Sequence, residues 1–203
     1  MSVPKLNAGL TVSAILLASG LSRRMGGVDK LLLPCPGAEN KSMLQVAVDL
    51  MDSFPFWEKI LVSTPKRFDR ILCPNTVQQI INPEPEAGQS KSVRMGVEHA
   101  TGAYYLFIPA DQPLLHVTVF QFIIKAAMQN PGKIIYPLVD GKPCNPVMFP
   151  NCFRDALCNQ HGDVGGRKLI SPSNSMGVNT SNPEYFIDID YEDEYKKLIR
   201  KGL

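Results

Sequence analysis

The chain has 203 residues, of which 44% are hydrophobic and 20% are charged, and its formal net charge is +2. This length and composition are typical of a globular protein and predict a single domain spanning residues 1–203. The small net charge gives no reason to expect nucleic acid or a membrane surface as a partner. No apolar run approaches the ~20 residues that a membrane-spanning helix needs. The first ten residues lack a signal-peptide apolar stretch, and the five cysteines are scattered, so we expect a cytoplasmic protein.

Apolar runs alternate with segments of helical spacing along the chain. Residues 11–19 form an apolar run of the kind expected for a strand buried on both faces. In residues 41–54, Leu44, Val48 and Met51 have helical spacing, and Ser42 is a candidate N-cap. Further strands are expected at residues 59–64, 76–82, 103–110, 133–139 and 145–150, and further helices at residues 90–100, 117–130, 151–160 and 191–201.

This alternation predicts an α/β fold, namely a single-domain, Rossmann-like three-layer sandwich. Its sheet would be mostly parallel, with helices on both faces. In such sheets ligands bind at the carboxyl ends of the strands. The functional residues should therefore lie in the loops that leave the strands.

The loop after the first strand is glycine-rich and basic, within the stretch "AILLASGLSRRMGGVDKLLLP". Its glycines allow tight turns, and backbone N–H groups in such a loop can bind phosphate oxygens. Arg24 and Lys30 would add the positive charge that a triphosphate requires. The spacing matches neither the P-loop nor the G-x-G-x-x-G pattern. The alternative is an ordinary glycine-rich surface loop with solvated basic residues.

This stretch resembles the signature loop of the MobA-like nucleotidyltransferases, which is roughly L-A-[AG]-G-x-S-x-R-M-G-x-x-K-L-L. Four later stretches resemble the family in the same order. The resemblance implies a nucleotide-diphospho-sugar transferase-like fold and Mg²⁺-dependent nucleotidyl transfer, with Arg24 and Lys30 as catalytic residues. It also implies nucleotide binding by Leu17, Ala18, Ser19, Gly20, Ser22, Arg24, Met25, Gly26 and Lys30.

Asp111 follows the expected strand 103–110, in "LFIPADQPLL". A carboxylate at the end of a strand can hold Mg²⁺, which binds one or two carboxylates together with substrate phosphates. The stretch resembles the family's G-D-x-P element, which implies that Asp111 is catalytic and binds both metal and nucleotide. Asp111 could also simply turn the chain before Pro113, and both roles are compatible.

A second candidate metal ligand lies in "YFIDIDYEDEYKKL" near the C-terminal end. This stretch resembles the family's D-I-D-T-P-E-D-L, which implies that Asp190 binds the metal, with Asp188 as the alternative. Tyr191 and Glu192 stand where the family has Thr and Pro. Asp190 could instead cap the following helix.

The stretch "NPEPEAGQSKSVRMGVEHA" carries neutral polar side chains at the start of an expected helix. Gln89, Ser90 and Ser92 offer the donors and acceptors that read the edge of a base. The resemblance implies that they bind the nucleotide. Ser90 or Ser92 is also expected to cap the helix.

The last of these stretches, "GKPCNPVMF" followed by "HGDVGGRKLI", resembles the acceptor side of the family. The resemblance implies acceptor binding by Asn145, Asp163 and Arg167, and the Arg167 fork suits a phosphate. Cys144 and Asn145 stand where the family has Gly and His, which leaves the identity of the acceptor open.

The motifs differ in the nucleotide that they indicate. "GQSKSVRMGV", "GDVGGR" and "DID" look like the cytidylyltransferase branch of the family, whereas "RMGGVDK" looks like the guanylyltransferase branch.

The implied reaction transfers CMP from CTP to the terminal phosphate of molybdenum-molybdopterin, a phosphorylated pterin cofactor, and releases pyrophosphate. The resemblance also implies a molybdenum hydroxylase as a partner. The alternatives are a GTP-dependent or other NTP transferase with a different phosphorylated acceptor, and a non-catalytic nucleotide-binding accessory protein for a molybdenum hydroxylase.

Overall fold

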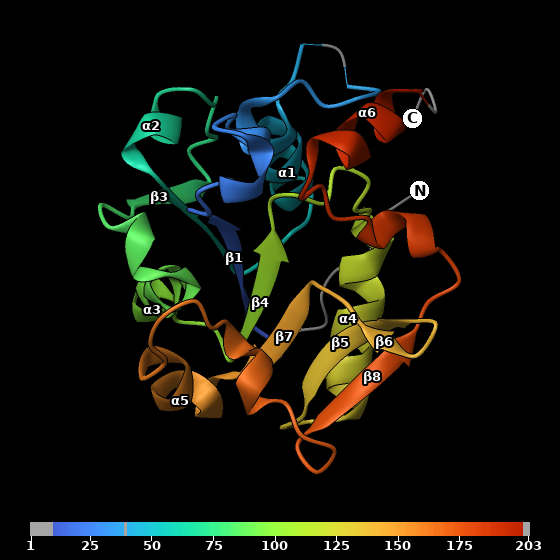
Figure 1. Cartoon of the computed structure of the whole chain (residues 1–203). Coiled ribbons are helices and arrows are strands. Elements are labelled where there is room, and N and C mark those ends of the chain that lie inside the picture. The colour runs from blue at the N-terminus through green and yellow to red at the C-terminus, as the bar shows by residue number, and fades with distance from the viewer. Residues whose placement is uncertain (1–9, 39, 201–203) are drawn as a thin grey trace.

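The computed structural model describes residues 10–38 and 40–200, and its central feature is an eight-stranded sheet (Figure 1). The expectation for residues 1–9, and the last residue of the expected helix 191–201, lie outside this part. The strands are β1 (Val12–Ala18), β2 (Glu58–Ser63), β3 (Val77–Ile81), β4 (Tyr104–Pro109), β5 (Ile134–Val139), β6 (Lys142–Pro143), β7 (Val147–Pro150) and β8 (Ser175–Asn179).

The five expected helices occur in the expected order, and a further short helix at Pro65–Phe68 was not predicted. As predicted, Ser42 caps the first long helix, because its Oγ accepts a hydrogen bond from the Gln45 N–H at 3.1 Å. The α-helices are α1 (Met43–Asp52), α2 (Pro65–Phe68), α3 (Gln89–His99), α4 (Val117–Gln129), α5 (Arg154–Cys158) and α6 (Glu192–Arg200). Short 3-10 helices include η1 (Arg23–Met25), η2 (Lys30–Leu32), η3 (Pro85–Ala87), η4 (Asn151–Phe153), η5 (Gly166–Leu169) and η6 (Pro183–Phe186).

The sheet has a parallel half and a mixed half. The strand order is β3-β2-β1-β4-β7-β5-β6, with β8 paired to β5. Strands β3, β2, β1 and β4 are mutually parallel, and β7 runs antiparallel between β4 and β5. Strand β8 pairs parallel with β5. We did not predict β8, because its sequence "SMGVN" lacks the apolar run of the inner strands. In the structure its residues are exposed or only partly buried.

Both faces of the sheet are buried under helices, which confirms the predicted three layers. Along β1, Val12, Ala14 and Leu16 belong to the core shared with α1, α4 and α6. Ile15 points to the opposite face, where the core is shared with α3 and α5 (Figure 1). Successive strand side chains point to opposite faces, so a strand covered on both sides reads as a continuous apolar run.

The parallel half determines where the site forms. Because β1, β2 and β4 are parallel, the chain leaves all three strands at one edge of the sheet. The loops that begin at Ser19, Thr64 and Ala110 therefore meet there. None of the helices in the described ranges combines the length and apolarity needed to span a bilayer.

Candidate active site

Lys30 lies at the centre of a cluster of charges at this edge. The residue is 8% exposed, and its Nζ donates hydrogen bonds to Asp111 Oδ2 and Asp190 Oδ1, both at 2.8 Å. Arg24 Nη1 donates to Asp190 Oδ2 at 2.9 Å. Arg24 and Lys30 lie in the loop after β1, Asp111 lies in the loop after β4, and Asp190 lies just before α6. The structure thus brings together the predicted cations and the two predicted metal ligands.

The charges of this cluster shift one another's pKa values. Burial by itself would lower the pKa of Lys30, but Asp111 and Asp190 outweigh it, so the pKa is raised. Burial likewise opposes the charge on Asp190, yet Lys30 and Arg24 lower its pKa. Burial, followed by the negative charge of Asp111, raises the pKa of Asp188 to about 6. At neutral pH Lys30 is therefore an ammonium held by carboxylates.

The glycine-rich loop turns back on itself between β1 and Lys30. Ser22, Gly26 and Gly27 have φ angles of 51°, 59° and 91°, in the left-handed region that favours glycine. The Ser22 Oγ accepts the Lys30 backbone N–H at 3.3 Å, and the buried Met25 side chain anchors the tip of the loop. These contacts close the loop and place Arg24 and Lys30 near the same carboxylate, Asp190.

The first residues of this loop lie against the sheet. Leu17 and Ala18 end β1, and Gly20 is exposed. The buried Ser19 side chain donates from its Oγ to the Val62 carbonyl at 3.2 Å. Because this hydroxyl is engaged with the sheet, the backbone of the loop is the part that can meet a phosphate.

A buried arginine beside this loop was missed by the sequence analysis. Arg67 is 2% exposed and donates to the carbonyls of Ala18 and Gly20 and to the carboxylate of Asp29. In the sequence, Asp29 directly precedes Lys30, and Arg67 follows shortly after an apolar strand. These positions alone do not indicate that the Asp29 and Arg67 side chains contact each other.

The segment expected to read a base begins α3, but its serines do not cap the helix. Gly88 is the N-cap residue and makes no side-chain cap, which makes that part of the prediction wrong. The Ser90 N–H instead donates to the carbonyl of Gly162 at 3.2 Å, so a neighbouring loop satisfies the helix start. The Ser92 Oγ accepts a hydrogen bond from the buried Asn82 Nδ2 at 3.1 Å.

The loop of residues 162–167 packs directly on the start of α3. A Cβ at Gly88 would lie 2.4 Å from the backbone carbon of Gly162, and one at Gly165 would lie 2.9 Å from the Gln89 Oε1. Only residues without a side chain allow this close approach. The exposed Gln89, expected to contact nucleotide, is thus next to the stretch expected to contact acceptor.

The predicted acceptor residues lie on two adjoining segments. Arg167 Nη2 is 3.5 Å from the Pro143 carbonyl, close in sequence to Asn145. Burial, with a smaller effect of the Asp188 charge, raises the pKa of the Cys144 thiol, so this segment also approaches the carboxylates. Asp163 is exposed, and its carboxylate accepts no hydrogen bond within the described residues.

The segment that carries Asp188 and Asp190 is held beside β4. The Ile189 N–H donates to the Asp111 carbonyl at 3.0 Å, and Gln112 Nε2 donates to Asp188 Oδ1 at 3.0 Å. The carboxylate of Glu194 accepts the N–H groups of Asp190 and Tyr191 at the start of α6. The Asp190 carboxylate is directed at Lys30 and Arg24, so it does not serve as the helix cap.

These residues fit a magnesium ion that is held partly by substrate. In the described part of the chain, no group of three or more His, Cys, Asp or Glu side chains could hold a metal alone. Asp111 and Asp190 nevertheless converge on one ammonium group. Mg²⁺ is commonly bound by one or two carboxylates plus phosphates, and these two side chains would supply that pair.

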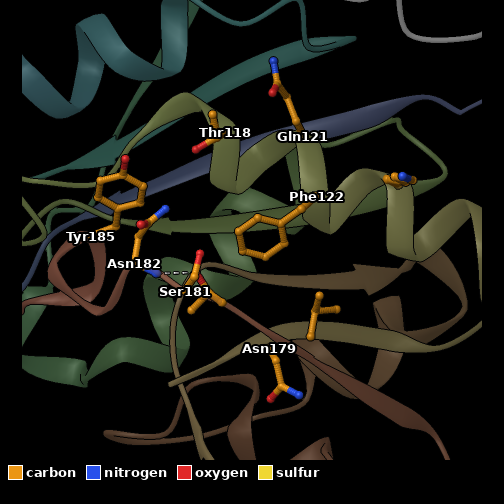
Figure 2. Close-up of a pocket in the computed structure, with 10 residues that line it drawn as sticks. Thr118, Gln121, Phe122, Asn179, Ser181, Asn182 and Tyr185 are labelled. Carbon is orange, nitrogen blue, oxygen red and sulfur yellow. Dashed lines mark hydrogen bonds between the residues drawn. The ribbon is translucent and has the colours of Figure 1, made fainter. Parts of the chain in front are cut away.

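A separate hollow of about 470 Å³ lies between α4 and the segment after β8 (Figure 2). Phe122 and Tyr185 contribute aromatic rings, and the remaining side chains are mostly neutral and polar. The lining consists of Thr118, Gln121, Phe122, Lys125, Val178, Asn179, Thr180, Ser181, Asn182 and Tyr185. None of the residues predicted for the site lines this hollow, so it is distinct from the carboxylate cluster.

Cations on a glycine-rich loop and carboxylates at the facing strand end are the features of an α/β domain that handles nucleotide phosphates. A match to a known family identifies the class of nucleotide-handling protein. The MobA-like NTP transferase domain matches residues 14–177. The chain therefore belongs to the MobA-like NTP transferases, and it is a nucleotidyltransferase.

Two relatives resemble the chain over most of its length. A probable molybdenum cofactor guanylyltransferase from Natranaerobius thermophilus is 27% identical over 147 residues, covering 70% of this chain and 68% of the relative. A molybdenum cofactor guanylyltransferase from Shewanella piezotolerans is 25% identical over 195 residues, covering 93% and 92%.

Solved structures share the fold at low sequence identity. A nucleotidyl transferase from Methanothermobacter superposes with a TM-score of 0.76 at 21% identity, covering 95% of this chain and 97% of that one. The Mycobacterium tuberculosis protein Rv0371c in complex with manganese gives a TM-score of 0.74 at 19% identity, covering 94% and 98%. These likenesses confirm the predicted nucleotidyltransferase fold.

Proposed function

We propose that this enzyme transfers CMP from CTP to the terminal phosphate of molybdenum-molybdopterin. The observation that carries the proposal is the cluster in which Lys30 contacts both Asp111 and Asp190 beside a glycine-rich loop. The two named relatives support molybdenum cofactor biosynthesis as its context. Gln89 and the "GDVGGR" loop support CTP, because they resemble the cytidylyltransferase branch.

The proposed reaction is an in-line displacement. A terminal phosphate oxygen of the pterin forms a bond to the α-phosphorus of CTP, and the bond from that phosphorus to the bridging oxygen of pyrophosphate breaks. Lys30 and Arg24 neutralise the charge on the triphosphate, and no covalent enzyme intermediate is needed. Bound Mg²⁺, held by Asp111 and Asp190, would neutralise further charge. Manganese in the Rv0371c structure supports a divalent metal.

The acceptor would approach from the side of residues 143–145 and 162–167. Arg167 would pair with an acceptor phosphate, since a guanidinium binds phosphate through two parallel hydrogen bonds. Asn145 and Asp163 would contribute polar contacts to the pterin. The proposal further places the enzyme in the cytoplasm as a single-domain protein that delivers its product to a molybdenum hydroxylase.

A GTP-dependent reaction is the second candidate. Both relatives are named as guanylyltransferases, and the "RMGGVDK" stretch resembles that branch. The acceptor and the roles of Lys30, Asp111 and Asp190 would be unchanged. Only the groups that contact the base would have a different role, because they would recognise guanine instead of cytosine.

The decisive experiment measures pyrophosphate release with Mg²⁺, molybdenum-loaded molybdopterin and either CTP, GTP or ATP. We expect release with CTP. Release with GTP alone would establish the second candidate. Nucleotide binding without release for any of the three would favour another acceptor or the accessory-protein alternative.

A further inference from the structure

The buried Arg67 side chain contacts residues at both ends of the glycine-rich loop. Its Nη1 donates to the Ala18 carbonyl, and its Nη2 donates to the Gly20 carbonyl at 2.7 Å. Its Nε and Nη2 donate to the two oxygens of Asp29 at 2.9 and 2.7 Å. One buried guanidinium thus ties the start of the loop to the residue that directly precedes Lys30.

These contacts determine the direction of two backbone amides. In a planar trans peptide the C=O and the following N–H point to opposite sides. Since the Ala18 and Gly20 carbonyls point at Arg67, the N–H groups of Ser19 and Leu21 point away from it. Neither N–H donates to an acceptor within residues 10–38 and 40–200. Two unused donors are therefore presented together on the face opposite the guanidinium.

The Asp29 carboxylate extends this arrangement to Lys30. Asp29 is turned toward Arg67, and its Oδ1 also accepts the Leu31 N–H at 3.3 Å. The next side chain, Lys30, reaches the carboxylate of Asp111. The orientation of Lys30 is thereby coupled to the same guanidinium that orients the two amides.

We infer that Arg67 is a positioning residue that holds the Ser19 and Leu21 N–H groups and the Lys30 ammonium ready for the phosphate chain of a nucleoside triphosphate. This inference rests on the proposed function, because it assumes that the loop binds a triphosphate. Arg67 does not touch the substrate itself. Its planar fork matters, since a lysine would keep the charge but has three donors on one nitrogen and could not contact both oxygens of Asp29 as well as the two carbonyls.

The chain offers a matched control for the loss of such a fork. Arg154 also donates to two carbonyls, those of Ala100 and Glu98, and to the Tyr105 hydroxyl. It lies on α5 and contacts the C-terminal end of α3, away from the glycine-rich loop. Arg154→Lys therefore removes the same kind of hydrogen bonds to two carbonyls, although none to a carboxylate, without touching the site.

The test measures binding of inorganic tripolyphosphate, Mg·CTP and Mg·GTP to the folded wild type, Arg67→Lys and Arg154→Lys by calorimetry. We expect Arg67→Lys to weaken tripolyphosphate binding by on the order of 10-fold or more, the usual effect of losing charge-assisted hydrogen bonds. Arg154→Lys should bind as the wild type does. Equal affinity of folded Arg67→Lys and wild type would overturn the inference.

A second readout separates positioning from stability alone. Amide NMR of the wild type should show tripolyphosphate-induced shifts at Ser19 and Leu21 that shrink in Arg67→Lys. If Arg67→Lys does not fold, Asp29→Asn takes its place, with the same expected direction and a smaller effect. Binding that leaves both amides unshifted would refute the inference while the proposed function stands. A wild type that binds no triphosphate would refute the proposed function as well.

Discussion

Lys30 Nζ lies 2.8 Å from Asp190 Oδ1, although 160 positions separate the two residues in the sequence. This contact joins the first loop of the fold to the segment that begins its last helix. The ammonium is also shared with Asp111. The catalytic proposal depends on this convergence, because a cation and two carboxylates must meet the same triphosphate.

Replacing Lys30 by Ala should reduce kcat/KM for nucleotidyl transfer by roughly 100- to 1,000-fold, as expected for loss of one group that stabilises transition-state charge. Lys59→Ala is the control, because Lys59 is equally buried, with 11% of its side chain exposed, and pairs with Asp52 at 2.7 Å. Steady-state kinetics of both variants checks the prediction. Comparable losses in the two variants would remove Lys30 from the site.

Asp111→Asn should lower kcat by about 100-fold or more and raise the Mg²⁺ concentration needed for half-maximal rate, because the amide keeps the shape but loses the charge that binds the metal. The matched control is Asp52→Asn, since the Asp52 and Asp111 side chains are 30% and 27% exposed and each pairs with a lysine. Rates are measured over a Mg²⁺ titration. A normal Mg²⁺ dependence in folded Asp111→Asn would disprove the metal assignment.

Asp188 should make stability depend on pH in the metal-free protein. Its pKa is raised from 3.8 to about 6, so between these values the folded state binds more protons than the unfolded state. The stabilising contribution is therefore complete below pH 3.8 and is lost as the pH rises through about 6. Urea unfolding should show Asp188→Asn gaining stability relative to the wild type over this range. Parallel curves would show that burial and Asp111 do not perturb this carboxyl.

Gly88→Ala should separate the start of α3 from the loop of residues 162–167. A Cβ at this position would meet the Gly162 backbone at 2.4 Å, and φ is +91°. Gly141→Ala is the control, because its φ of +74° is also left-handed but no atom lies within 4 Å of the added Cβ. We expect Gly141→Ala to cost about 1 kcal/mol of unfolding free energy.

Gly88→Ala should cost more than this control, and it alone should raise the KM for nucleotide. Chemical denaturation and kinetics on the two variants provide the measurements. If both variants lose the same stability and keep the wild-type KM, the contact between α3 and the loop has no role in nucleotide binding.

The elements that dominate the core could be predicted from the sequence. Strands β1 and β4 and helices α1 and α4 carry long apolar patterns, because a buried strand or helix face must be apolar along its whole length. Strand β8 was missed because it lies at the edge of the sheet, where half-exposed side chains give no such pattern. The serine cap of α3 was predicted wrongly, because a carbonyl from a loop distant in sequence satisfies that helix start.

Residue types and their spacing were enough to predict the local chemistry of this protein: a glycine-rich basic loop, carboxylates after a strand and before a helix, and neutral polar groups at a helix start. Which of these groups meet is visible only in the folded arrangement of strands and loops. Lys30 is paired with Asp111 and Asp190, and Arg67 lies beneath the loop beside Asp29. This difference arises because residue type and spacing act over only a few positions of the chain. Contacts between distant residues, in contrast, arise from parallel strand pairing, which brings separate loops to one edge of the sheet.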